Sequence, residues 1–123
     1  MAYRKKYVAL IVDDDSLVRN IHKKYLSKNG FAIKMAENGH DAVELIRSGN
    51  MFDLIVMDLD MPIMNGIQAT REIRSMGVRS LVIGMSASTS DTMIQEFISA
   101  GLDDYYPTPM NMAKLAAIVR RLE

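Results

Sequence analysis

Short apolar runs alternate with segments of helical periodicity along the whole chain. The runs predict strands at residues 7–12, 31–36, 52–57, 80–85 and 105–106. The segments between and after them predict helices at residues 16–28, 40–48, 66–76, 92–100 and 111–122. Strands that alternate with helices in this way imply a parallel sheet covered on both faces. Because crossovers between parallel strands are right-handed, we expect a doubly wound (βα)5 fold of the α/β class in one domain, residues 1–123.

Several helix boundaries carry local signals of their own. Asp15 or Ser16 can cap the first helix, and Thr92 with Gln95 has the spacing of a capping box at the start of the fourth. The run at residues 31–36 alternates apolar and polar side chains, which is typical of an edge or half-buried strand.

Composition restricts the classes of function that the chain can have. The hydrophobic content of 49% argues against disorder, and the net charge of zero gives no electrostatic reason for nucleic-acid binding. No cysteine is present, which excludes a disulfide framework and a thiolate metal site and fits a reducing compartment. The longest apolar runs, residues 8–12 and 115–119, are too short to span a membrane. We therefore expect a protein of the cytoplasm or also the nucleus, with neither nucleic acid nor membrane as a partner.

Polar side chains follow several of the predicted strands at their carboxyl ends. Asp13 and Asp14 follow the first strand, Asp58 the third and Ser86 the fourth. These ends meet at one edge of a parallel sheet, so the side chains should converge. Two carboxylates about 4 Å apart repel by roughly 4 kcal/mol at an effective dielectric of about 20, so such a cluster either raises its pKa values or holds a cation. Oxygen ligands of this kind suit Mg²⁺, or Mn²⁺ as an alternative.

A carboxylate beside a divalent cation and a hydroxyl group suits phosphoryl transfer. Asp58 can act as the nucleophile and form an aspartyl phosphate, while Ser86 donates a hydrogen bond to the phosphoryl group and Ala87 leaves room for it. The competing interpretation, in which strand-end aspartates only cap the following helices, is preferred here for Asp15 alone.

The motifs resemble those of two-component response regulator receiver domains over almost the whole length of the chain. They are Asp13-Asp14, Asp58-x-x-Met61-Pro62-x-x-x-Gly66, Ser86-Ala87 and Ala100-Gly101-x-x-Asp104-Tyr105 ahead of Pro109. The chain resembles stand-alone receivers of the plant type more than bacterial transcription factors. This finer resemblance rests on the strand Ile83-Gly84-Met85-Ser86 and on the expected lack of an output domain. The resemblance implies a flavodoxin-like sheet in the order 2-1-3-4-5. It also implies a signalling domain that promotes only its own phosphorylation and dephosphorylation.

The resemblance further implies a role for each matching residue. Asp58 would accept a phosphoryl group from a phosphohistidine on a histidine kinase or a histidine-phosphotransfer protein. Asp14 would bind Mg²⁺ directly, Asp13 largely through water, and the backbone carbonyl of Asp60 would complete the protein's ligands beside Asp58. Ser86 and Tyr105 would form the switch.

Residues around this centre receive secondary roles from the same resemblance. Asp60 and Ser88 occupy positions that tune the lifetime of the phosphate. Leu17, on the outer side of the first helix, is a candidate contact for the phosphotransfer partner. We expect a monomer or weak dimer.

One position departs from the family pattern. The family has a lysine before the last proline, where this chain has Thr108 in Pro107-Thr108-Pro109. Threonine can donate a hydrogen bond but carries no charge, so we expect metal binding to persist while phosphoryl stabilisation and switching weaken. Pro107 is expected to shorten the fifth strand, and the resemblance implies a cis bond between Thr108 and Pro109.

Two other functions stay open at this stage. The first is a pseudo-receiver, a binding module uncoupled from phosphorylation. The second is a small phosphatase that takes the phosphoryl group from a phosphohistidine partner. Asp58-x-Asp60 also resembles the motif of haloacid-dehalogenase-type phosphatases, in which the second aspartate is a general acid-base.

Overall fold

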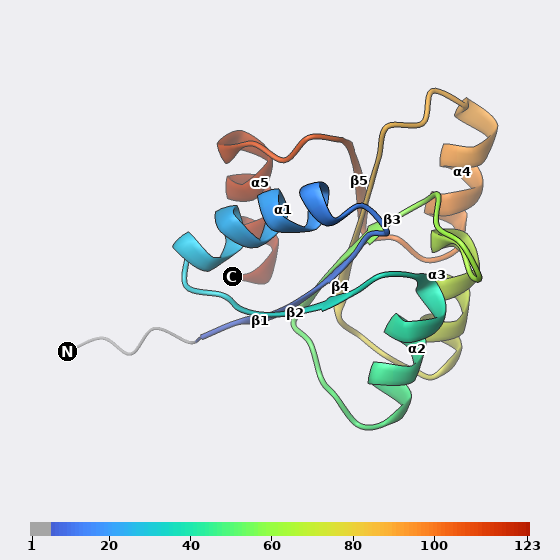
Figure 1. Cartoon of the computed structure of the whole chain (residues 1–123), viewed down its shortest axis with the longest axis horizontal. Coiled ribbons are helices and arrows are strands. Elements are labelled where there is room, and N and C mark those ends of the chain that lie inside the picture. The colour runs from blue at the N-terminus through green and yellow to red at the C-terminus, as the bar shows by residue number, and fades with distance from the viewer. Residues whose placement is uncertain (1–5) are drawn as a thin grey trace.

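The protein is a five-stranded parallel sheet with five helices, in the strand order β2-β1-β3-β4-β5 (Figure 1). The computed structural model describes residues 6–123, so Arg4, Lys5 and the rest of residues 1–5 lie outside the described residues. The elements in chain order are β1 (Val8–Val12), α1 (Ser16–Lys28), β2 (Ala32–Ala36), α2 (Gly39–Arg47), β3 (Leu54–Asp58), α3 (Gly66–Ser75), β4 (Leu81–Ser86), α4 (Asp91–Ser99), β5 (Asp104–Pro107) and α5 (Met112–Leu122). The predicted fold class and strand order are confirmed.

The helices form two layers, with α1 and α5 on one face of the sheet and α2, α3 and α4 on the other (Figure 1). Successive strand residues point to opposite faces, so each layer has its own hydrophobic core. Leu10, Ile55 and Met57 belong to one core, and Ile11 and Val56 belong to the other. Both faces are therefore closed by helices, and the edge of the sheet at the strand ends is left for a site. Within residues 6–123, no helix is both long and apolar enough to cross a membrane.

Strand β5 extends to Pro107, which contradicts the prediction that this proline shortens the strand. Pro107 pairs with Ser86, and the N–H of Thr108 donates to the carbonyl of Ser86 at 3.1 Å. Because alternate residues of a strand direct their N–H groups to the same neighbour, the nitrogen of Pro107 faces away from β4. β5 lies at the edge of the sheet, where no partner strand needs that donor.

The first turn of α4 begins earlier than the predicted capping box. The hydroxyl of Ser90 accepts from the N–H of Met93 at 3.3 Å, so Ser90 rather than Thr92 is the N-cap, and the prediction of a box at Thr92 and Gln95 is wrong. A complete capping box lies instead at the start of α3, between Asn65 and Gln68. The prediction of a cap at Asp15 is confirmed by its bond from Leu17 N–H at 2.9 Å.

Gly66 brings the start of α3 against the end of β3. A Cβ atom at this position would overlap the backbone carbonyl of Asp58 and would also contact the ring of Phe97. The N–H of Gly66 donates to the carbonyl of Leu59 at 2.9 Å. This bond joins the two ends of the loop between β3 and α3. The backbone of Asp58 is therefore held in place by a contact that only glycine permits.

Candidate functional site

Three carboxyl groups meet at the edge of the sheet where β1 and β3 end. One oxygen from each of Asp13, Asp14 and Asp58 lies within 4.8 Å of the others, so the expected convergence is present. Asp13 is buried, Asp58 is half-buried and Asp14 is exposed. The group therefore opens to solvent on the side of Asp14, and a ligand can reach it there.

Backbone hydrogen bonds hold two of these carboxyl groups in place. The N–H of Asp15 donates to Oδ1 of Asp13 at 2.9 Å, and the N–H of Leu59 donates to Oδ1 of Asp58, also at 2.9 Å. The N–H of Asp13 in turn donates to the carbonyl of Ala36 at the end of β2. The loops after β1 and β3 thus orient one oxygen of each carboxylate.

The surroundings of Asp58 oppose its ionisation. Burial raises its pKa to about 7, and the negative charges of Asp13, Asp14 and Asp60 act in the same direction against the hydrogen bond from Leu59. Burial also raises the pKa of Asp13. Clustered, mutually repelling carboxyl oxygens are the donor set that a hard divalent cation prefers, so these residues fit such an ion.

Arg19 is a cation beside this cluster, and the sequence motifs do not predict its role. Its Nη1 donates to the carbonyl of Asp13 at 2.7 Å, and its Nη2 lies 3.8 Å from Oε1 of Glu37. The guanidinium charge lowers the pKa of Asp13, against the larger effect of burial. Arg19 is a charged residue of α1, yet its side chain is only 13% exposed. Its position one turn into the helix that follows the acidic pair was the one available signal.

A second group of predicted residues surrounds the end of β4. Ser86 is 1% exposed, and its hydroxyl oxygen accepts from the N–H of Ser88 at 2.9 Å. The hydroxyl of Tyr105 donates to the carbonyl of Ser86 at 3.3 Å, and its ring packs edge-on against Phe97 at a centroid separation of 6.3 Å. Thr108 reaches the same carbonyl through its N–H, and its bond to Pro109 is cis, as expected. The structure therefore gathers Ser86, Ser88, Tyr105 and Thr108 around the end of one strand.

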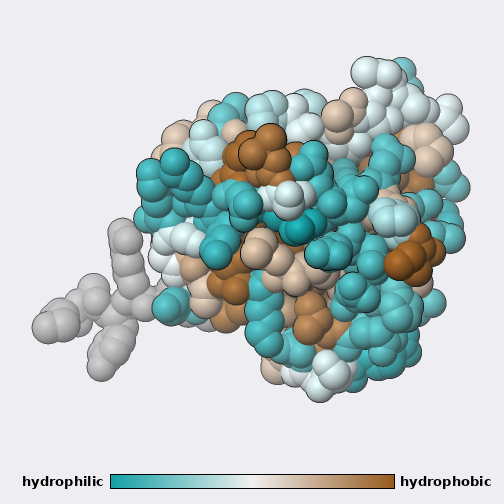
Figure 2. Space-filling model, viewed as in Figure 1, coloured by the Kyte–Doolittle hydropathy of each residue, from teal (hydrophilic) through white to brown (hydrophobic). Residues whose placement is uncertain are grey.

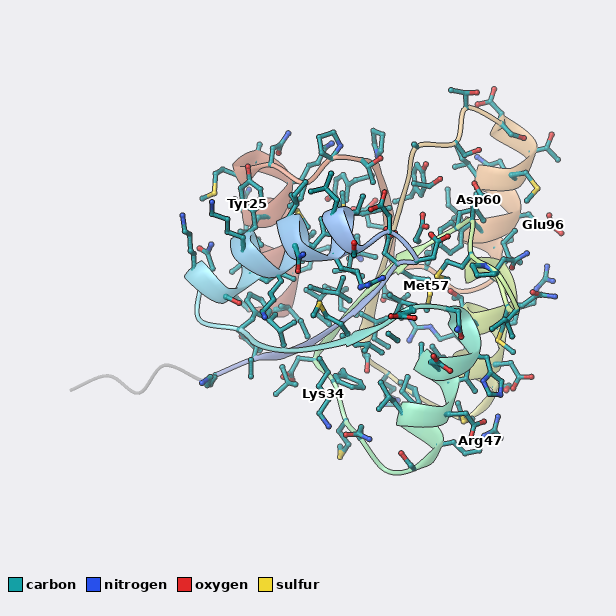
Figure 3. All side chains as sticks on the ribbon, in the orientation of Figure 1. Tyr25, Lys34, Arg47, Met57, Asp60 and Glu96 are labelled. Atoms are coloured by element: carbon teal, nitrogen blue, oxygen red, sulfur yellow. The ribbon has the colours of Figure 1, made fainter. Side chains whose placement is uncertain are left out.

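Asp60 lies exposed on the loop that leaves β3 (Figure 3). The loop then turns at Ile63, whose φ of 70° is unusual for a β-branched residue. Across this turn the N–H of Met64 donates to the carbonyl of Pro62 at 2.7 Å, which is a γ-turn. The negative charge of Asp60 raises the pKa of Asp58, although the Asp60 side chain is not part of the group formed by Asp13, Asp14 and Asp58.

Leu17 lies outside the acidic group, in the first turn of α1. Its side chain is 67% exposed, and that of Met112 at the start of α5 is 60% exposed. Hydrophobic surface is visible over the α1 side of the molecule in Figure 2. Leu17 is thus on the surface beside the site, where a partner protein could contact it.

The model of the response regulator receiver domain family matches residues 9–120. The chain belongs to this family. Two Arabidopsis thaliana proteins are similar to this receiver over most of their length. Two-component response regulator 24 is 42% identical, over 95% of this chain and 84% of the relative. Two-component response regulator ARR22 is 36% identical, over 97% of this chain and 86% of the relative.

Solved receiver domains have the same fold as this receiver. The receiver domain of Francisella response regulator 1452 has a TM-score of 0.83 and 31% identity, over 95% of this chain and 96% of that one. The receiver domain of sensor histidine kinase PA1611 from Pseudomonas aeruginosa, solved with a magnesium ion coordinated in the active site cleft, has a TM-score of 0.85 and 28% identity, over 96% and 98%.

Proposed function

We propose that this receiver is the phosphoacceptor of a phosphorelay and that Asp58 takes the phosphoryl group from a phosphohistidine. The observation that carries the proposal is the meeting of Asp13, Asp14 and Asp58 within 4.8 Å at the open edge of the sheet. In the transfer, a carboxylate oxygen of Asp58 attacks phosphorus and forms an O–P bond. The P–N bond breaks, and its electron pair stays on the imidazole of the donor. Attack of water then returns the carboxylate and releases inorganic phosphate.

The acidic group would hold Mg²⁺, and Mn²⁺ could take the same place. The ligands would be the carboxylates of Asp13, Asp14 and Asp58 together with the backbone carbonyl of Asp60, with Asp13 acting largely through water. When bound, the ion would offset the negative charge on the phosphoryl oxygens. The magnesium ion in the similar PA1611 receiver domain supports this assignment.

Ser86 and Tyr105 would form the conformational switch. The Ser86 oxygen accepts a hydrogen bond from Ser88, which leaves its own proton free for an oxygen of the phosphoryl group. Movement of Ser86 toward that group would alter the contact between its carbonyl and the Tyr105 hydroxyl. Ser88 lies beside Ser86, and the charge of Asp60 acts on Asp58, so these two residues would set how long the phosphate persists. A histidine kinase or histidine-phosphotransfer protein in the cytoplasm or nucleus would be the donor.

Thr108 makes this site a weak acceptor in our proposal. Within residues 6–123, the pKa of Asp58 is raised by burial and by acidic neighbours and lowered by the hydrogen bond from Leu59, and Thr108 can offer only a neutral hydrogen bond. Replacing it by lysine, Thr108→Lys, supplies a charge-assisted bond to the phosphoryl group. We expect the phosphorylated fraction with a small-molecule phosphodonor to rise about tenfold, the equivalent of ~1.4 kcal/mol.

The test compares acid-labile phosphate in the wild type, Thr108→Lys and Asp58→Asn, with Asp58→Asn as the control for labelling at other residues. An equal phosphorylated fraction in the wild type and Thr108→Lys would show that the missing lysine does not limit the site. Beryllofluoride binding measured on the same variants separates the acceptor from a pseudo-receiver, which would bind none.

A further inference from the structure

The segment Pro107-Thr108-Pro109 has a single backbone donor. Prolines lack an N–H, so only Thr108 can donate, and its N–H goes to the carbonyl of Ser86 at 3.1 Å. One hydrogen bond therefore ties this segment to β4, at the residue that carries the phosphoryl-binding hydroxyl in the proposed function. The carbonyls of Pro107 and Pro109, on either side of Thr108, remain as acceptors for further hydrogen bonds.

Lys114 holds those two carbonyls. Its Nζ donates to the carbonyl of Pro107 at 2.5 Å and to that of Pro109 at 2.8 Å, so it binds the two groups that flank Thr108. Hydrogen bonds from a charged donor are about twice as strong as neutral ones. Within residues 6–123 no carboxylate forms an ion pair with Lys114. These two carbonyls are thus its partners.

The position of Lys114 in its helix gives no other reason for a cation. It lies in the first turn of α5, where its N–H donates to the side chain of the N-cap Asn111 at 2.8 Å. A positive charge at this end of a helix opposes the helix dipole and is unfavourable. The two hydrogen bonds to the β5–α5 segment offset this cost, so the lysine acts on the segment rather than on its own helix.

We call the hydrogen bonds from Lys114 to the carbonyls of Pro107 and Pro109 the clamp. The clamp leaves the hydroxyl of Thr108 available. In the part of the chain that the structure describes, this hydroxyl makes no hydrogen bond, whereas the backbone of Thr108 is held beside Ser86. We propose that Lys114 is a positioning residue of the phosphoacceptor site, which holds Thr108 so that its hydroxyl donates to the phosphoryl group on Asp58. This inference rests on the proposed function and adds a residue that acts through Thr108.

The test measures the half-life of acid-labile phosphate on Asp58 in a double-mutant cycle. Lys114→Met removes the clamp, and Thr108→Val removes the hydroxyl at nearly constant shape. We expect Lys114→Met to shorten the half-life about tenfold, the equivalent of one lost hydrogen bond, and Lys114→Arg to restore most of it. In the Thr108→Val background, Lys114→Met should have no further effect, because the two residues act as a unit.

Arg120→Met, an exposed cation on the same helix, is the matched control and should keep the wild-type half-life. A wild-type half-life in Lys114→Met would overturn the inference, and so would an undiminished effect of Lys114→Met in the Thr108→Val background, which is the result of a general loss of stability. A wild type that accepts no phosphate defeats the proposed function instead. The holding of Thr108 by Lys114 is then tested on its own by nuclear magnetic resonance, where Thr108 signals that move in Lys114→Met but not in Arg120→Met support it and unmoved signals overturn it.

Discussion

At the scale of single residues, Asp58 has two conflicting requirements. In the proposed function it must be ionised to attack phosphorus, yet burial and its acidic neighbours raise its pKa to about 7. A divalent cation in the cluster would reverse this balance, since it would favour the charged carboxylate. The acidic neighbours that oppose the ionisation of Asp58 could therefore promote it by binding such an ion.

The raised pKa predicts how the stability of the metal-free protein depends on pH. The folded form keeps a proton on Asp58 up to about pH 7, whereas the unfolded chain loses it near the ordinary value of 3.8. The folded state thus binds more protons in this window, and the free energy of unfolding should fall as the pH rises from 4 to 7. Asp58→Asn should flatten this dependence in part, because Asp13 also has a raised pKa.

Urea unfolding at pH 5 and pH 8 in the presence of a chelator measures this effect. Glu44→Gln, which removes an exposed carboxyl of α2, should keep the wild-type dependence. If the wild type and Asp58→Asn lost the same free energy between the two pH values, the cluster would not be the cause.

The three acidic residues could be predicted from the sequence because strand ends determine their place. Arg19 and Lys114 could not, since their roles depend on where a long side chain bends and which carbonyl it meets. His22 illustrates the same limit, because helical spacing does not reveal that it is 2% exposed with both ring nitrogens lacking a hydrogen-bond partner in the described structure. Its burial lowers its pKa to about 4, which keeps it neutral in the core.

At the scale of elements, Arg74 joins three segments at one end of the sheet. The opposite end, where Asp13, Asp14 and Asp58 meet, is called the acidic edge. The guanidinium of Arg74 donates to the carbonyls of Gly101, Val78 and Ser80, each at 2.9 Å. It also donates to Asp103 at 2.8 Å, and Asp103 accepts from the N–H of Val82. α3 is thereby fixed to the loops before β4 and β5.

Removal of this group should destabilise the fold. Arg74→Met leaves three carbonyls without their guanidinium donor and removes the ion pair with Asp103, and we expect the free energy of unfolding to fall by roughly 2–3 kcal/mol. Arg71→Met is the matched control on the same helix. Its exposed ion pair with Glu96 at 3.8 Å should contribute less than about 1 kcal/mol. Urea denaturation distinguishes the two, and equal losses would contradict this account of Arg74.

Element types followed from the sequence, whereas some boundaries did not. The alternation of apolar runs and helical periods predicted every strand and helix, because each period reflects a buried face. The start of α4 was misplaced because Ser90 and Thr92 are both residue types that cap helices, and the structure has Ser90 as the N-cap. The length of β5 was underestimated because the outward-facing nitrogen of an edge-strand proline is visible only once the strand order is known.

At the scale of the whole molecule, the net charge is zero, but acidic and basic side chains are exposed in different regions of the surface. Asp14 and Asp60 are exposed at the acidic edge, whereas Lys23, Lys24 and Lys28 are exposed on α1. Leu17 lies between these regions, in the first turn of the same helix. A partner that delivers a phosphoryl group to Asp58 would therefore approach past Leu17.

This arrangement predicts a selective effect of a charge at Leu17. Leu17→Glu should slow phosphoryl transfer from a phosphohistidine protein about tenfold, the size of one interface contact of ~1.4 kcal/mol. The rate with a small-molecule phosphodonor should not change, since that donor needs no docking surface. Met51→Glu is the control, because Met51 is 86% exposed just before β3, at the opposite end of the sheet. Equal transfer rates from the protein donor to the two variants would exclude Leu17 from the interface.

The central claim is that Asp58 accepts a phosphoryl group with the help of a divalent ion. The most direct test is the transfer of labelled phosphate from a phosphohistidine protein to the wild type and to Asp58→Asn, each with Mg²⁺ and with a chelator. We predict acid-labile label on the wild type with Mg²⁺ only, and none on Asp58→Asn. Label that persists on Asp58→Asn, or a wild type that stays unlabelled with Mg²⁺, would contradict the claim.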